Sequence, residues 1–296
     1  MKNILLSLFI FSWICNTPVF AMKLITNTES DRIVPSREMG SFYISSEQDK
    51  NIKNGVYIIP GYKAETYAAI YKPELEKKGY KVQIVEFSDY VQPNNALAEK
   101  EIDVNVFQHS TYLKKFSTDH NLDLQYLTEI PTAAMAIFSD RYNSIADLPK
   151  GAVIAIPNDD TNLARALRVL AQTGAIGLDP AKDASKASVK DVTVNPKGFT
   201  FKEVNAEILP SVLDSVGAAI INGNYAMSAG LKLSDAVYNE KLEAGYYNVI
   251  AVRTEDVEKD FSKEIYSIVH SDGFRKVIEN PDGQYVAFGR PVDYEK

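Results

Sequence analysis

Strand-like and helix-like segments alternate through the first regular part of the sequence, and this alternation restricts the fold more than any other feature. Runs of alternating or continuous apolar residues predict strands, and the segments between them have helical character. The predicted strands cover residues 53–59, 81–87 and 102–106, and the predicted helices cover residues 64–79 and 93–100. A strand-helix-strand order predicts parallel pairing with right-handed crossovers, as in an α/β sheet.

The third predicted strand leads into the segment most typical of a binding site. Residues 102–106 read Ile-Asp-Val-Asn-Val, and residues 107–112 continue as Phe-Gln-His-Ser-Thr-Tyr. The carboxyl ends of parallel strands open into a crevice, where α/β folds hold small ligands. Rings and hydrogen-bonding groups at this point therefore predict one wall of a ligand pocket.

A further series of strands and helices predicts a second lobe and a return to the first. Lobe 1 is expected to comprise residues 51–131 and 246–296, and lobe 2 residues 132–245. Further strands are predicted at residues 122–127, 133–138, 151–156, 199–204, 216–221 and 247–252. A helix is predicted to begin at the capping residues 158–161 and to end at residue 173, and two more are predicted at residues 256–270 and 271–279.

One arginine in the helix after residue 161 is a candidate anion ligand. Leu163, Ala166, Leu167 and Leu170 form one buried stripe at helical spacing. Arg165 faces away from this stripe and lies near the positive end of the helix, where anions bind. An ordinary solvated arginine is the alternative at this position.

The first 21 residues have the pattern of a secretory signal. Lys2 precedes an apolar run, and small residues precede a predicted cleavage site after Ala21. The run is too short for a stable membrane span. Residues 22–50 are polar and are expected to form a flexible tether. Export across the inner membrane follows from this interpretation.

The single cysteine, Cys15, lies within the predicted signal, so the mature chain has no disulfide, thiol nucleophile or cysteine metal ligand. As an alternative, Cys15 is a lipid-attachment site that anchors the protein to a membrane. Ile14 occupies the place where a lipid-attachment signal has a small residue.

Composition and motifs exclude several function classes. A net charge of -7 without a basic stripe argues against nucleic-acid binding. Nucleotide-binding glycine loops and nucleophile elbows are absent from the sequence, and its three histidines have no metal-site spacing. We therefore expect no catalytic residue, no metal and no cofactor. Asp159 and Asp160 are adjacent carboxylates, but a helix cap explains them better than acid–base chemistry.

The residues alone leave the pocket candidates open. His109 is either a ligand contact or a hydrogen-bonded structural histidine. Phe107 and Tyr112 suit core packing as well as a pocket, although they bracket a polar segment. Asn222 and Asn248 follow or begin apolar runs, where asparagines also cap turns.

Four blocks, in order, resemble the NlpA lipoprotein family, which comprises methionine-binding components of ABC importers. The blocks lie at residues 87–94 with 103–113, 156–167, 195–197 with 222–226, and 247–250, and the resemblance extends from about residue 52 to the C-terminus. It implies two α/β lobes of the type II periplasmic-binding class, each with a mixed sheet flanked by helices, and a ligand in the cleft between them.

The resemblance also implies roles for individual residues. Arg165 is expected to hold the ligand carboxylate, and Asn222 and Asn248 its amino-acid backbone groups. The side-chain pocket is expected to be lined by Tyr90, Phe107, His109 and Tyr112. Two departures from the family pattern, Pro60-Gly61 after the first strand and Thr111 in place of a proline, mark positions where specificity is expected to differ.

The function expected from the resemblance is delivery of L-methionine, or a closely related amino acid, to a membrane permease and its ATPase by a monomeric protein. D-methionine, a short methionine-containing peptide or another apolar amino acid are alternative cargoes. An enzyme using His109 as its base, or an adhesin, are alternatives of a different class.

Overall fold

A five-stranded mixed sheet forms the centre of one lobe. The computed structural model describes residues 53–57 and 65–295. The strand order is β10 (Tyr238–Asn239), β4 (Ala136–Phe138), β9 (Ala218–Ile221), β5 (Val153–Pro157) and β8 (Thr200–Val204). β5 pairs in parallel with β8 and β9, whereas β4 is antiparallel to both β9 and β10. β4 and β9 are entirely buried, which explains their short, unbroken apolar sequences.

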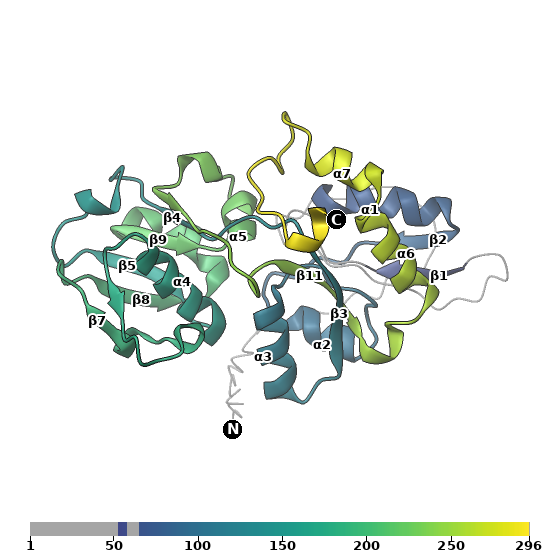
Figure 1. Cartoon of the computed structure of the whole chain (residues 1–296), viewed down its shortest axis with the longest axis horizontal. Coiled ribbons are helices and arrows are strands. Elements are labelled where there is room, and N and C mark those ends of the chain that lie inside the picture. The colour runs from purple at the N-terminus through teal and green to yellow at the C-terminus, as the bar shows by residue number, and fades with distance from the viewer. Residues whose placement is uncertain (1–52, 58–64, 296) are drawn as a thin grey trace, which may run out of the picture. The chain divides into compact units, whose positions relative to one another are not determined.

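Two pairs of strands form the framework of the other lobe. β1 (Lys53–Tyr57) is parallel to β2 (Tyr80–Gln83), as predicted. β3 (Leu124–Ile130) is antiparallel to β11 (Asn248–Arg253), and Figure 1 shows these two strands side by side. All six residues of β11 are buried. Because β11 follows the five-stranded sheet in the chain, its pairing with β3 joins two segments that are distant in sequence.

The other described elements include seven α-helices and a further pair of short strands. The helices are α1 (Glu65–Lys77), α2 (Gln92–Ala98), α3 (Ser110–His120), α4 (Asp160–Gln172), α5 (Gly223–Ser228), α6 (Asp260–Val269) and α7 (Asp272–Ile278), and a small separate sheet pairs β6 (Gly177–Leu178) with β7 (Val192–Val194). Helix α1 continues through Pro73, where the sequence predicted a kink or a new segment. No described helix has the length and apolar character needed to cross a membrane.

The segment predicted as a third parallel strand, residues 102–106, is not a strand. In the described structure it meets β11 through an isolated bridge between Asn105 and Ala251. Its Ile102 carbonyl accepts a hydrogen bond from Arg253 Nη1 at 2.5 Å, and the Asp103 carboxylate accepts one from Arg253 Nη2 at 2.7 Å. The strand prediction is wrong because Ile102 N donates to the Ala96 carbonyl and the Ile102 carbonyl accepts from Arg253, so neither backbone group pairs with a neighbouring strand.

Gly223 allows the start of α5 to approach the chain just before β4. A Cβ atom at this position would lie 2.6 Å from Ala133 Cβ and 2.7 Å from the Ala134 carbonyl oxygen. Both neighbours belong to a buried segment, so neither moves without disturbing the core. A side chain at residue 223 would therefore push α5 away from β4.

We predict that Gly223→Ala lowers the free energy of unfolding by about 1–3 kcal/mol, as overpacking does in cores. Gly273→Ala is the matched control, because its Cβ would meet only Ser271 Oγ, at 3.7 Å, within helix α7. That control should be neutral or stabilising by about 0.4–1 kcal/mol. Urea unfolding measures both, and equal shifts in the two variants would contradict the close-approach argument.

Candidate ligand-binding site

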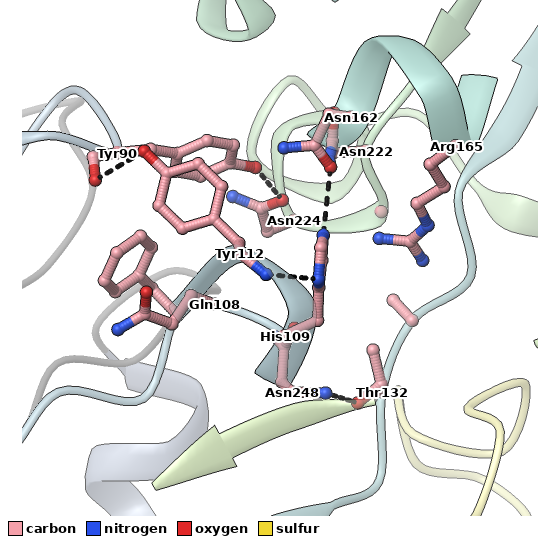
Figure 2. A pocket seen from close by; sticks show the side chains of 13 residues that line it. Tyr90, Gln108, His109, Tyr112, Thr132, Asn162, Arg165, Asn222, Asn224 and Asn248 are labelled. Carbon is pink, nitrogen blue, oxygen red and sulfur yellow. Dashed lines mark hydrogen bonds between the residues drawn. The ribbon is translucent and has the colours of Figure 1, made fainter. Parts of the chain in front are cut away.

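One cavity brings together all seven side chains predicted to bind ligand. The lining residues are Tyr90, Phe107, Gln108, His109, Tyr112, Thr132, Ala133, Asn162, Arg165, Asn222, Gly223, Asn224 and Asn248. Figure 2 shows Arg165 on one side of His109 and the rings of Tyr90 and Tyr112 on the other. The cavity thus has a charged end and an aromatic end.

Backbone bonds to β11 hold the segment that carries His109. The Gln108 carbonyl accepts a hydrogen bond from Val249 N at 2.9 Å, and His109 forms an isolated bridge with Asn248. His109 then caps helix α3, because its Nδ1 accepts from Tyr112 N at 3.1 Å. These contacts place His109 and Asn248, which are 139 residues apart in sequence, at one point of the cavity.

His109 is a neutral histidine in the folded protein. Burial and the positive charge of Arg165 lower its pKa to about 3. Its side chain caps helix α3 and also lines the cavity, so the structural interpretation is confirmed and the ligand contact stays a prediction. A group with this pKa is a poor general base at neutral pH.

An aromatic wall forms the apolar end of the cavity. The Tyr90 ring centroid lies 5.6 Å from that of Phe107, 5.9 Å from that of Tyr112 and 4.8 Å from that of Tyr225. The Tyr90 hydroxyl donates to Asn224 Oδ1 at 2.7 Å. Burial raises the pKa of the Tyr90 phenol well above its usual value, so the wall remains uncharged. Tyr225 was part of a family block but was not predicted as a site residue.

Arg165 is buried in an ion pair and is not the solvated arginine considered as the alternative. Its side chain is 4% exposed, and its Nε and Nη2 atoms donate to Glu240 Oε1 and Oε2 at 2.9 and 2.6 Å. Burial lowers the pKa of Arg165, but the charge and hydrogen bonds of Glu240 outweigh this and raise it overall. Two of the five guanidinium N–H groups are used by Glu240, which leaves three for another acceptor.

Glu240 is a functional candidate that the sequence did not indicate. It lies 75 residues from Arg165, directly after β10, and Glu240 Oε2 also accepts from Met135 N at 3.0 Å. A single glutamate among many charged residues gives no pattern by itself. Only its position in the folded chain reveals the pair.

Asparagine side chains make up the polar lining between the two ends. Asn222 Nδ2 donates to Asn162 Oδ1 at 2.8 Å, whereas Asn222 Oδ1 is buried and has no hydrogen-bond partner among the described residues. Asn248 begins β11, and its backbone N donates to Thr132 Oγ1 at 2.7 Å. Asn162, Asn224 and Thr132 were not predicted as site residues.

The remaining sequence predictions differ in how far the structure bears on them. Thr111 is not one of the lining residues, and its N and Oγ1 both donate to the Gly245 carbonyl at 3.1 and 2.9 Å, so its expected effect on specificity stays a prediction. Asp159 caps helix α4, as expected. The loop at Pro60-Gly61, the cleavage site at Ala21 and the lipidation candidate Cys15 lie outside the described residues.

Comparison with known proteins shows which family has this sequence pattern. The model of the NlpA lipoprotein family matches residues 55–288. The chain belongs to the NlpA lipoprotein family. Among curated relatives of this NlpA family protein, the D-methionine-binding lipoprotein MetQ of Escherichia coli (strain K12) is 34% identical over 230 residues, which are 76% of this chain and 84% of that protein.

Solved structures of other family relatives have the same fold. A nutrient binding protein from Burkholderia cenocepacia bound to methionine is 35% identical, with a TM-score of 0.69 over 73% of this chain and 91% of that one. An ABC transporter periplasmic substrate-binding protein from Coxiella burnetii is 31% identical, with a TM-score of 0.71 over 77% and 95% of the two chains. The predicted two-lobed α/β fold with mixed, helix-flanked sheets is confirmed.

His109 gives the stability of the protein a pH dependence of defined sign. The unfolded chain takes up a proton near pH 6.5, whereas the folded imidazole resists protonation down to about pH 3. The stability that depends on neutral His109 is complete above pH 6.5 and is lost as the pH falls towards 3. We predict a loss of about 2 kcal/mol in the free energy of unfolding between pH 7.5 and 5.0 from this residue.

Urea unfolding at the two pH values measures this loss, and His109→Gln should remove it. The exposed His270→Gln variant is the control and should retain the full pH dependence of the parent. If His109→Gln lost as much stability as the parent on acidification, another group would be responsible.

Proposed function

We propose that this protein is the substrate-binding component of an ABC importer and binds L-methionine or a closely related amino acid. The observation that carries the proposal is the order of groups along one cavity: a guanidinium with unused donors, an unpaired amide oxygen and an aromatic wall. A free apolar amino acid has the complementary groups in the same order, which are a carboxylate, an ammonium and an apolar side chain.

Arg165 binds the carboxylate in this proposal. Because Glu240 occupies the Nε side of the guanidinium, the Nη1 and Nη2 end remains for a second, bidentate carboxylate. The Arg165–Glu240 pair has no net charge, so a zwitterionic ligand leaves the buried site neutral. This balance favours a free amino acid over a dianion.

Asn222 and Asn248 receive the remaining backbone groups, and the rings receive the side chain. The unpaired Asn222 Oδ1 is an acceptor for the ligand ammonium. A thioether packs well against the edges of aromatic rings such as Tyr90, Phe107 and Tyr112. His109, as a neutral ring, closes the space between these two ends.

The relatives support methionine but differ in what their names specify. The Escherichia coli relative is named for D-methionine, and the Burkholderia cenocepacia structure holds methionine. D-methionine, a short methionine-containing peptide and another apolar amino acid are the alternative cargoes. Mass spectrometry of the ligand that co-purifies with the native protein distinguishes them.

The protein is a binding protein and not an enzyme, in keeping with its family. His109, the one base considered for catalysis, is held neutral and capped against Tyr112. We propose that lobe 1 (residues 51–131 and 246–296) and lobe 2 (residues 132–245) close around the ligand. The partners are a permease and its ATPase, and the protein acts as a monomer.

The periplasm is the proposed location, with signal cleavage after Ala21. Acylation at Cys15 is the alternative, because the family and its Escherichia coli member are named as lipoproteins. Metabolic labelling with a radioactive fatty acid distinguishes the two, because only an acylated Cys15 would carry the label.

We predict that Arg165→Lys weakens binding of L-methionine by about 30-fold or more, because a lysine keeps the charge but loses the bidentate fork. Titration calorimetry with the twenty amino acids measures the affinity and the preference. Undiminished binding in Arg165→Lys would rule out the carboxylate contact.

Arg168→Lys is the matched control for this experiment. Arg168 lies one turn further along helix α4, pairs with Glu243 and is not one of the lining residues. Its replacement should change the affinity by no more than about fivefold, as expected for a partly exposed ion pair.

A further inference from the structure

A chain of side-chain hydrogen bonds leads from a helix cap to the cavity. Its first member, Asp159, caps helix α4 by accepting from Asn162 N at 3.0 Å. The same carboxylate accepts from Asn162 Nδ2, which lies 3.0 Å from both Asp159 oxygens. Because a carboxylate offers acceptors alone, the amide NH₂ of Asn162 must face Asp159.

The orientation of Asn162 determines that of Asn222. With its NH₂ group on Asp159, Asn162 presents Oδ1 to the cavity side, where it accepts from Asn222 Nδ2 at 2.8 Å. Asn222 then has to turn its own oxygen away from Asn162. This oxygen is the buried acceptor that lacks a partner among the described residues.

His109, at the other end of this series of hydrogen bonds, independently requires the same orientation of the Asn162 amide. Tyr112 N donates to His109 Nδ1, so the neutral ring carries its hydrogen on Nε2. His109 Nε2 lies 3.3 Å from Asn162 Oδ1 and acts there as a donor. Both Asp159 and His109 therefore require Asn162 to present its oxygen to the cavity. Figure 2 shows His109, Asn162 and Asn222 close together.

We propose that Asp159, acting through Asn162, is a positioning residue that fixes the Asn222 amide with its oxygen towards the ligand and so selects ligands that bring a hydrogen-bond donor there. The proposal rests on the proposed function and deepens it: the ligand class is one with an ammonium beside its carboxylate. The sequence suggested Asp159 only as a helix cap. Its second role arises because both of its oxygens reach the side-chain amide of Asn162.

The test compares methionine with its des-amino analogue, 4-(methylthio)butanoate, by titration calorimetry. The parent protein should bind methionine about 30-fold more tightly or better, because the analogue leaves Asn222 Oδ1 unpaired. Asn162→Ala frees the Asn222 amide to turn its NH₂ group to the ligand, and it should reduce the preference to about fivefold or less. Asp159→Asn keeps a capping oxygen for helix α4 and should shift the preference in the same direction.

Asn158→Ala is the matched control, because Asn158 lies in the same loop but bonds Asn205 at the surface. It should retain the full preference of the parent. A parallel loss of affinity for both ligands in Asn162→Ala, with the preference unchanged, would overturn the proposal and leave Asn162 a purely structural role.

A second measurement needs no ligand. The ¹⁵N chemical shifts of His109 in the unliganded protein should report hydrogen on Nε2 and none on Nδ1 at neutral pH. Hydrogen on Nδ1 would overturn the proposed chain. If neither ligand bound the parent protein while His109 carried its hydrogen on Nε2, the proposed function would fail and the positioning chain would stand.

Discussion

The Arg165 guanidinium is a positive charge buried within the protein, and such a charge requires a partner. Glu240 supplies this partner through two hydrogen bonds and is itself held by Met135 N. The pair joins helix α4 to the segment before β4 and to the segment after β10. Removing either member alone would leave an uncompensated buried charge, which is far more costly than losing a surface ion pair. The charged end of the cavity therefore depends on this contact.

The rest of the cavity avoids further charge. His109 is held neutral by burial and by Arg165, and the tyrosine hydroxyls remain protonated for a similar reason. Amide groups supply other polar contacts, and those of Asn162, Asn222 and Asn224 are oriented by hydrogen bonds to neighbours. Gln108, which lines the cavity, forms hydrogen bonds of 2.6–2.8 Å with the buried Asn94 and Asn105, and these two also bond each other. A site of this kind suits a ligand that carries both charges itself.

The position of these groups depends on long-range contacts with β11. This strand pairs with β3, bridges to Asn105 and His109, and ends at Arg253, which bonds the carbonyls of Leu97 and Ile102. One buried strand thus aligns helix α2, the segment before helix α3 and the start of the cavity wall. These contacts fix the position of the cavity wall beside β11, and a selective binding site needs its groups held in position in this way.

The sequence by itself determined the order of most strands and helices, the cap at Asp159 and seven of the thirteen residues that line the cavity. Apolar runs and caps are local signals, and the family blocks carried the site residues. The strand predicted at residues 102–106 was wrong, because an alternating pattern fits an extended segment equally well with or without a neighbouring strand.

The tertiary structure alone decided the roles of Glu240 and Asn162 and the direction of the Asn222 amide. These depend on contacts across 75 and 60 residues. Such contacts produce no repeating pattern in the sequence. A buried charge or amide needs only one partner, and that partner can lie anywhere along the sequence.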